Sequence, residues 1–144
     1  MDLFKTMEIS ASGLQAQRTM INVISMNLAN VHTTRTVEGG PYRRKQTIFS
    51  LAPLPEKFRG LLYRRMGQEP PGVKVDVVED PRKLEMIFDP SHPDADETGY
   101  LFLPNVNVVE EMTNLLAALR SFEANVTVFN SAKNMALKSL EISR

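Results

Sequence analysis

The side chains best suited to binding a metal lie in one acidic segment, residues 94–99, which reads DADETG. Acidic side chains at alternate positions and a glycine in sixth place resemble the start of an EF-hand calcium loop. Such a loop ends in a bidentate glutamate at its twelfth position, whereas Asn105 stands there in this chain. The ligand set is incomplete, so the segment is predicted to form an acidic turn, and no metal site is predicted.

The same region offers carboxylates for acid–base chemistry. A peptidoglycan-cleaving enzyme, acting through Asp94 or Glu97, would need an apolar pocket that raises the pKa of one carboxyl group and a platform for the sugar. The segment has one tyrosine nearby, and the chain has no tryptophan. Cleavage of glycosidic bonds is therefore ranked last among the possible functions, and no catalytic residue is predicted.

The other common signatures of chemistry are missing. His32 and His92 are far apart in the sequence, and neither belongs to a zinc-type spacing. No phosphate-binding or dinucleotide-binding glycine pattern is present, and neither is the Gly-x-Ser-x-Gly motif of a serine nucleophile. No cofactor is predicted.

A basic strip, Arg43 to Lys45, lies between Tyr42 and Phe49 and weakly resembles a nucleic-acid-binding strand. The formal net charge of the chain is zero, and no further aromatic residues are interleaved with the basic ones. We therefore predict no nucleic-acid partner, and a strip that forms a solvated or subunit-facing edge.

Charge is unevenly distributed along the middle of the chain. Residues 32–66 carry eight basic and two acidic side chains, and residues 69–97 carry three basic and nine acidic ones. Such segments either pair, within one subunit or between neighbours, or form two solvated faces of one small domain.

A long amphipathic helix is predicted over residues 105–144, which contain no glycine and no proline. Its apolar positions follow steps of four and three, interrupted only by Lys133, and such a repeat keeps one seam towards a partner helix. These positions are Val108, Met112, Leu115, Leu119, Phe122, Val126, Phe129, Ala136 and Leu140. At about 1.5 Å per residue the helix would be roughly 55 Å long. A chain of 144 residues cannot wrap a compact core around it, so the stripe needs a partner in this chain or in another. Asn107 is predicted to cap its start.

A second long helix is predicted over residues 3–30. Apolar residues recur in it every seven positions, at Met7, Leu14, Ile21 and Leu28. Gly13 costs about 1 kcal/mol relative to alanine inside a helix, so it marks either a close helix approach or a soft spot. Asn27 and Asn30 are expected to end the helix, since asparagine tolerates the left-handed conformation.

The segment between the helices alternates short strand-like runs with breakers. Strands are predicted at residues 42–51, 61–66, 73–77, 84–88 and 100–103, and turns or loops at residues 32–41, 53–60, 69–72 and 89–99. The predicted fold is therefore α+β: long N- and C-terminal helices paired as a coiled-coil-like unit, with a small β-rich insert. The corresponding parts are an N-terminal helix (1–31), the insert (32–104) and a C-terminal helix (105–144).

No cysteine, no cleavable signal peptide and no run long enough to span a membrane is found. By these ordinary signals the protein is cytoplasmic or leaves the cell by another route. One hypothesis is accordingly a cytoplasmic coiled-coil adaptor that dimerises through residues 105–144.

Several motifs point to a different answer. The chain resembles the flagellar rod and hook (axial) protein family, and most closely the proximal rod proteins of the bacterial basal body. The resemblance spans nearly the whole chain and is carried by Ile9–Leu14, Ala16–Arg18, Asn27–Asn30, Thr33–Thr36, Gly39–Lys45, Asp89–Ala95, Gly99–Tyr100, Pro104–Asn107, Glu110–Met112 and Glu123–Val126. Departures are small: His32 stands where the family usually has asparagine, and Phe122 where tyrosine is common.

The resemblance implies a structural, non-enzymatic subunit that stacks helically into the hollow rod, the shaft that carries torque for motility. It implies export by the flagellar type III apparatus without a cleaved signal, a place in the basal body across the periplasmic space, and terminal helices that order on assembly. The implied partners are other copies of the chain, other rod proteins, the motor-ring and export-gate base, and the export apparatus. The expected subunit-interface residues are Met7, Leu14, Ile21, Leu28, Met112, Leu115, Leu119, Phe122, Val126, Phe129 and Leu140.

Overall fold

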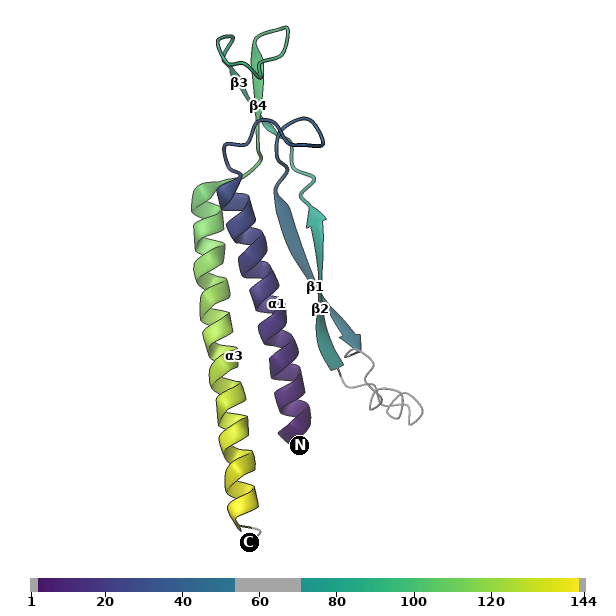
Figure 1. Cartoon of the computed structure of the whole chain (residues 1–144), viewed down its shortest axis with the longest axis vertical. Helices are drawn as coiled ribbons and strands as arrows, with labels where there is room; N and C mark the ends of the chain where they lie inside the picture. Colours follow the sequence, from purple (N-terminus) through teal and green to yellow (C-terminus); the bar gives the residue numbers. More distant parts are fainter. Residues whose placement is uncertain (1–2, 54–70, 143–144) are drawn as a thin grey trace. The chain divides into compact units, whose positions relative to one another are not determined.

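The structure is a computed structural model of the chain that describes residues 3–53 and 71–142. In this described part of the chain, two long helices, α1 (Leu3–Ala29) and α3 (Val108–Ile142), flank four strands in the sequence. The strands are β1 (Lys45–Pro53), β2 (Pro71–Glu79), β3 (Glu85–Phe88) and β4 (Tyr100–Leu103) (Figure 1). The predicted α+β class, with long terminal helices and a small β-rich insert, is confirmed.

The chain forms two compact units. The first contains the described parts of residues 1–19, 48–76 and 117–144, and the second contains residues 20–47 and 77–116. Each unit includes a segment of both long helices, and within each the two segments run antiparallel (Figure 1). The division into parts at residues 31 and 104 stays a prediction.

Asparagine side chains bond the backbone at the C-terminal end of α1 and at the N-terminal end of α3. After α1, the Asn30 side-chain amide donates to the carbonyl oxygen of Met26 at 2.8 Å. Before α3, the Asn107 side-chain oxygen accepts the N–H groups of Val109 and Glu110 at 3.0 and 3.2 Å, which confirms the predicted cap. The helix itself begins at Val108, three residues later than the predicted start.

The expected role of Asn27 was wrong. No described residue other than glycine has a positive φ, so neither Asn27 nor Asn30 adopts the left-handed conformation. Asn27 instead lies within the last turns of α1, and its side chain is fully buried. A buried side chain with two donors and an acceptor must find partners, and these are described with the candidate site.

The buried seam of α3 is offset from the predicted apolar stripe. Every member of this inner seam is buried or half-buried: Glu111, Leu115, Ala118, Phe122, Asn125, Phe129, Ala132 and Ala136. Steps of four and three are kept, so the predicted period holds. Every second member of the seam, however, is small or polar: Glu111, Ala118, Asn125 and Ala132. Of the predicted stripe, Met112, Leu119 and Leu140 are 60%, 41% and 68% exposed.

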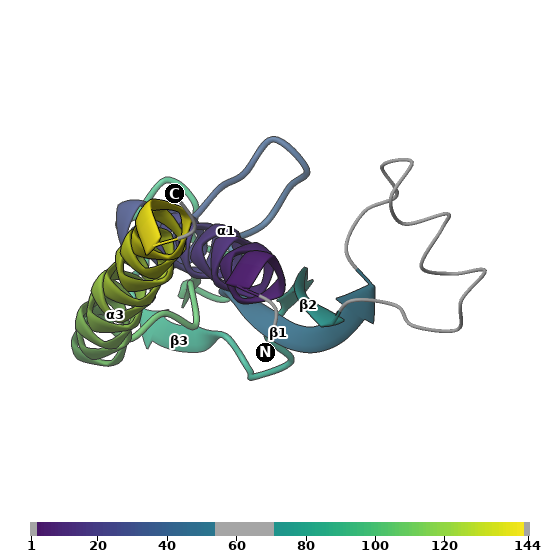
Figure 2. The same cartoon turned by 90° about the horizontal axis from the view of Figure 1, so that it is seen from below.

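In the first unit, α1 lies between α3 and the β1–β2 ribbon (Figures 1 and 2). A Cβ atom added to Gly13 would lie 3.3 Å from the Asn125 side-chain nitrogen, which confirms a close helix approach at this glycine. On the other side of α1, the Ser12 hydroxyl accepts the N–H of Val73 in β2 at 3.3 Å. The small residues of α1 therefore let two neighbours approach its backbone.

Within its described residues, the insert contains two separate two-stranded sheets, β1–β2 and β3–β4. In the second sheet Met86 pairs with Phe102 and Phe88 with Tyr100, antiparallel, and both strands match the prediction. β1 starts three residues later than predicted. The turn predicted at residues 69–72 was wrong for residues 71 and 72, because β2 already starts at Pro71. The strand predicted at residues 61–66 and most of the loop predicted at 53–60 lie outside the described residues.

Candidate functional site

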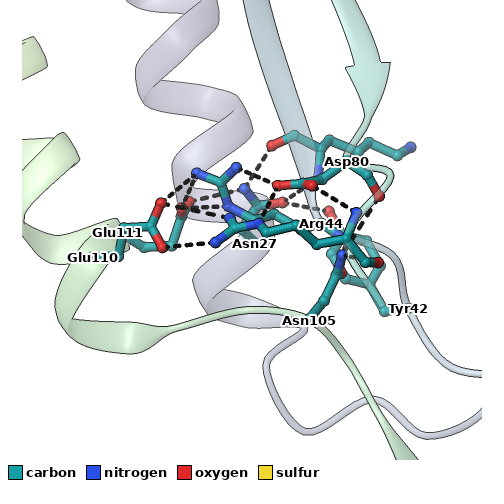
Figure 3. Close-up of polar contacts among 9 residues, drawn as sticks. Asn27, Tyr42, Arg44, Asp80, Asn105, Glu110 and Glu111 are labelled. Carbon is teal, nitrogen blue, oxygen red and sulfur yellow. Dashed lines mark hydrogen bonds and ion pairs between the residues drawn. The ribbon is translucent and has the colours of Figure 1, made fainter. Parts of the chain in front are cut away.

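Five buried side chains meet in the second unit (Figure 3). We call them the polar cluster: Asn27, Tyr42, Arg44, Asp80 and Glu111. They come from the end of α1, the segment before β1, the residue after β2 and the first turn of α3. Four segments that are distant in the sequence are thus joined through polar atoms.

Arg44 lies at the centre of the polar cluster. Its Nε and Nη2 atoms donate to Glu111 Oε1 at 2.8 and 2.6 Å. Its Nη1 atom donates to Asp80 Oδ2 at 2.9 Å. Charge-assisted bonds of this kind are about twice as strong as neutral ones, and the planar guanidinium fixes the directions of both carboxylates.

Asn27 uses every hydrogen-bonding group of its amide. Its Nδ2 atom donates to the carbonyl oxygen of Lys45 and to Glu111 Oε2, both at 2.8 Å. Its Oδ1 atom accepts the hydroxyl of Tyr42 and the N–H of Lys45, both at 2.9 Å. Aspartate could not make the two donations, and leucine could make none of the four bonds, so the position specifies asparagine.

An outer layer of partly exposed groups surrounds Asp80. The backbone N–H of Arg82 donates to Asp80 Oδ1 at 2.9 Å and its Nε atom to Oδ2 at 2.8 Å. Arg82 also bonds Glu110 at 3.1 Å. Asn105 accepts the N–H of Arg44 at 2.8 Å and donates to the carbonyl oxygen of Arg82 at 3.0 Å. The segment after β2 is held by this layer.

These contacts set the protonation of the polar cluster. Burial raises the pKa of the Tyr42 hydroxyl, and the nearby carboxylates of Glu111 and Glu79 raise it further. Burial alone would raise the pKa of Asp80, but hydrogen bonds from Arg82 and Arg44 outweigh it and lower that pKa. For Arg44, burial acts to lower the pKa, and the bonds to Glu111 and Asp80 raise it overall. At neutral pH Tyr42 is a neutral donor, Asp80 is ionised and Arg44 is a cation.

The prediction that the strip from Arg43 to Lys45 is a solvated or subunit-facing edge was wrong for Arg44. Its side chain is buried and paired, whereas Arg43 is exposed. The charge pattern did contain a signal, since Arg44 lies in the basic segment and Asp80 in the acidic one. Pairing of these segments within one subunit is seen at this contact. Glu111 was noted only as favourable to the helix dipole, and its burial was missed.

The acidic segment at residues 94–99 forms turns, as predicted. Asp94 accepts a hydrogen bond from the Thr34 hydroxyl at 2.8 Å, and Glu97 is exposed. Gly99, with φ +79°, packs so tightly against Phe88 that a Cβ atom there would lie 2.9 Å from its ring. Within residues 3–53 and 71–142, no group of three or more His, Cys, Asp or Glu side chains is placed to hold a metal ion.

The predicted interface residues fall into two groups. Half-buried are Met7, Leu14, Ile21 and Leu28 of α1 and Leu115, Phe122, Val126 and Phe129 of α3. The other three, Met112, Leu119 and Leu140, are exposed. Large apolar side chains left exposed along a helix are typical of a contact surface. Their role in subunit contacts stays a prediction.

Comparisons with known proteins agree on one family. Residues 7–35 match the model of the flagella basal body rod proteins, and residues 97–142 match the C-terminal model of the flagellar basal body rod FlgEFG proteins. Among the described residues, no helix is long and apolar enough to cross a membrane.

Full-length relatives narrow the family. The chain is 44% identical to the flagellar basal-body rod protein FlgC of Borreliella burgdorferi, over 99% of the chain and 98% of that protein. It is 42% identical to FlgC of Bacillus subtilis and 38% identical to FlgC of Salmonella typhimurium, in both cases over the full length of both proteins.

The α+β order of elements, with a long helix at each end of the chain, and the two family models define a structural protein of the flagellar rod. Within that class, the full-length identities show that the chain belongs to the FlgC family of flagellar basal-body rod proteins. The protein is therefore a structural subunit of the basal body, and it assembles with other rod proteins.

Proposed function

We propose that the chain polymerises helically through its terminal helices into a hollow shaft that transmits torque. The N-terminal helix (1–31) and the C-terminal helix (105–144) form the tube wall, and the insert (32–104) contacts neighbours outside it. Its partners are other copies of the chain, other rod proteins and the motor-ring and export-gate base.

One observation carries this proposal: α3 is apolar on two sides. Its inner seam is already used within the chain, yet Met112, Leu119 and Leu140 remain exposed. Burying apolar area is worth about 25 cal/mol per Å², so a row of such side chains favours contact with another helix. A coiled-coil adaptor would need the same row for a single partner, whereas membership in a rod family favours repeated assembly.

The route to the assembly site is part of the proposal. The subunit leaves the cell unfolded through the flagellar type III export apparatus, without a cleaved signal, and enters the rod in the periplasmic space. The helices order fully when their exposed rows are covered, because an amphipathic helix gains most of its stability from packing of its apolar face.

Replacing Leu119 by aspartate tests the proposal in cells where the variant is the only copy of the chain. Leu119 is exposed, so the charge should leave the fold of the subunit intact while blocking rod assembly and swimming. Ser121→Asp is the matched control, because Ser121 is exposed two residues away on another side of α3.

Rod formation is measured by electron microscopy of isolated basal bodies, and export by the amount of the chain outside the cytoplasm. We expect Leu119→Asp to be exported but absent from rods, and Ser121→Asp to behave as wild type. Normal rods and swimming with Leu119→Asp would refute the proposal. Leu115→Asp and Phe122→Asp should also block assembly. These side chains are half-buried in the subunit, however, so their replacement would also disturb the fold of the subunit itself.

A further inference from the structure

A tight turn projects between α1 and β1 in the second unit (Figure 2). We call residues 36–40 the projecting turn. The N–H of Thr36 donates to the carbonyl oxygen of Gly40 at 2.8 Å, and the N–H of Gly39 donates to that of Thr36 at 3.1 Å. Gly39 and Gly40 have φ values of +91° and +76°, which suit glycine and strain other residues. The turn is therefore held in one shape by its own backbone.

The tip of the projecting turn packs on no other described residue. Val37 is fully exposed, and a Cβ atom added to Gly39 or Gly40 would find no neighbouring atom within 4 Å. The tip thus consists of one apolar side chain beside two glycines, whose backbone can approach another surface closely. A preformed tip of this kind loses little conformational entropy when it binds an apolar surface.

The β3–β4 sheet has a large apolar face that no other described element covers. Directly opposite residues of an antiparallel sheet share a face, so the pairs Met86–Phe102 and Phe88–Tyr100 lie on one face. We call these four residues the sheet face, and all four are exposed. The rings of Phe88 and Tyr100 meet edge to face, with centroids 5.2 Å apart. Exposed apolar patches of this kind are typical of contact surfaces.

Charge favours a match between the projecting turn and the sheet face. Residues 84–103 carry five acidic side chains and no lysine or arginine. Arg35 and Arg43 flank the projecting turn, are exposed, and form no ion pair among the described residues. The acidic residue of the turn, Glu38, has a possible counterpart in Lys83, which is exposed before β3 and also forms no such pair. Complementary charges orient two surfaces and disfavour other partners.

We propose that the projecting turn of one copy packs on the sheet face of a second copy, with Val37 against the apolar side chains. This inference rests on the proposed function and identifies one contact of the insert with a neighbour. A second copy supplies the turn, because Val37 and the sheet face are both exposed within the same subunit and so do not cover each other.

The contact uses two different surfaces of each copy. A copy offers its projecting turn to one neighbour and its sheet face to another, so the contact is heterologous and propagates, as a rod requires. If two copies instead exchanged their turns about a two-fold axis, the contact would close as a dimer.

The absence of cysteine from the chain allows a direct test. The double variant Val37→Cys, Met86→Cys replaces the wild-type chain in cells, and isolated basal bodies are treated with a short bis-maleimide. Both positions are exposed in the subunit, so the fold should be kept. We expect a ladder of linked copies on a denaturing gel. Linked dimers alone would show the closed pair, and no linking in assembled rods would exclude the contact; either result overturns the proposal.

Val37→Cys, Thr113→Cys is the matched control for the linking experiment. Thr113 is also exposed in the second unit, but it lies on α3 and outside the sheet face. We expect no ladder from this pair. A ladder as strong as that from positions 37 and 86 would mean that linking reports crowding in the rod, and it would overturn the assigned contact.

Charged variants of Val37 cover the case in which the cysteine variant fails to assemble. Val37→Asp places an acid against the acidic sheet and is expected to lower the yield of rods about tenfold or more, whereas Val37→Lys should lose less. Equal losses from both variants would overturn the choice of partner. If Leu119→Asp blocks assembly but Val37→Asp forms normal rods, the proposed function stands and this contact is refuted.

Discussion

Replacing Glu111 by alanine is the most informative perturbation of the polar cluster. The side chain of Glu111 is fully buried, and it accepts two bonds from Arg44 and one from Asn27. After the replacement, Arg44 keeps Asp80 at 2.9 Å and has only Glu110 nearby, at 3.6 Å and 43% exposed. Breaking a buried ion pair in this way costs about 3–5 kcal/mol, because the remaining charge is left without its partner.

Glu110→Ala is the matched control for the loss of stability expected from Glu111→Ala. Glu110 is the adjacent residue of α3 and also faces arginines, but its side chain is 43% exposed. Exposed ion pairs contribute about 0–1 kcal/mol. The two variants remove the same carboxylate from neighbouring positions, so their difference measures burial and not charge.

Urea unfolding of the purified chain, followed by circular dichroism, gives both values. With an m-value of about 1–3 kcal/mol/M, Glu111→Ala should lower the unfolding midpoint by about 1 M or more, and Glu110→Ala by at most about a third of that shift. Glu111→Gln should fall between them, because glutamine keeps the shape and one acceptor but loses the charge. If Glu111→Ala and Glu110→Ala lower the midpoint equally, the polar cluster does not hold the second unit together.

Two further changes test the neighbouring contacts. The pKa of Asp80 is lower in the folded chain, so its stabilising effect is present above its unfolded pKa, near 3.9, and is lost as pH falls through the folded value. Asp80→Asn should therefore lower stability at pH 7 but have a smaller effect near pH 3; an equal loss of urea midpoint at both pH values would contradict the assigned charge. Asn107→Ala removes the cap of α3 and should cost about 1 kcal/mol, whereas Asn107→Asp should cost little; equal unfolding midpoints for Asn107→Ala and wild type would argue against the cap.

The sequence was most informative where structure is set by local repetition. A pattern of three and four steps predicts a helix because side chains at those spacings share a face. Both long helices, the cap at Asn107, β3 and β4 followed from such local signals. The family resemblance added function, which periodicity alone did not provide.

The sequence did not show which face of α3 is buried within the subunit. On α3 the apolar stripe and the buried seam differ, because a helix with several partners carries several faces and apolarity does not say which is internal. Glu111 and Asn27 were missed for a related reason: polar residues are expected outside, and only their mutual contacts make burial favourable. Those contacts join positions 27, 44, 80 and 111, whose proximity depends on the whole fold of the second unit.

The buried and the exposed sides of α3 have different roles: the first fixes alignment within the subunit, and the second holds apolar area that can be buried on assembly. The inner seam uses small residues and the polar cluster, and buried ion pairs contribute little net stability while making misalignment costly. The exposed apolar side chains of α3 retain their favourable burial energy until another subunit arrives. In the proposed shaft, alignment within each subunit comes from Arg44, Asn27 and Glu111. Cohesion between subunits comes from the exposed apolar side chains of α3.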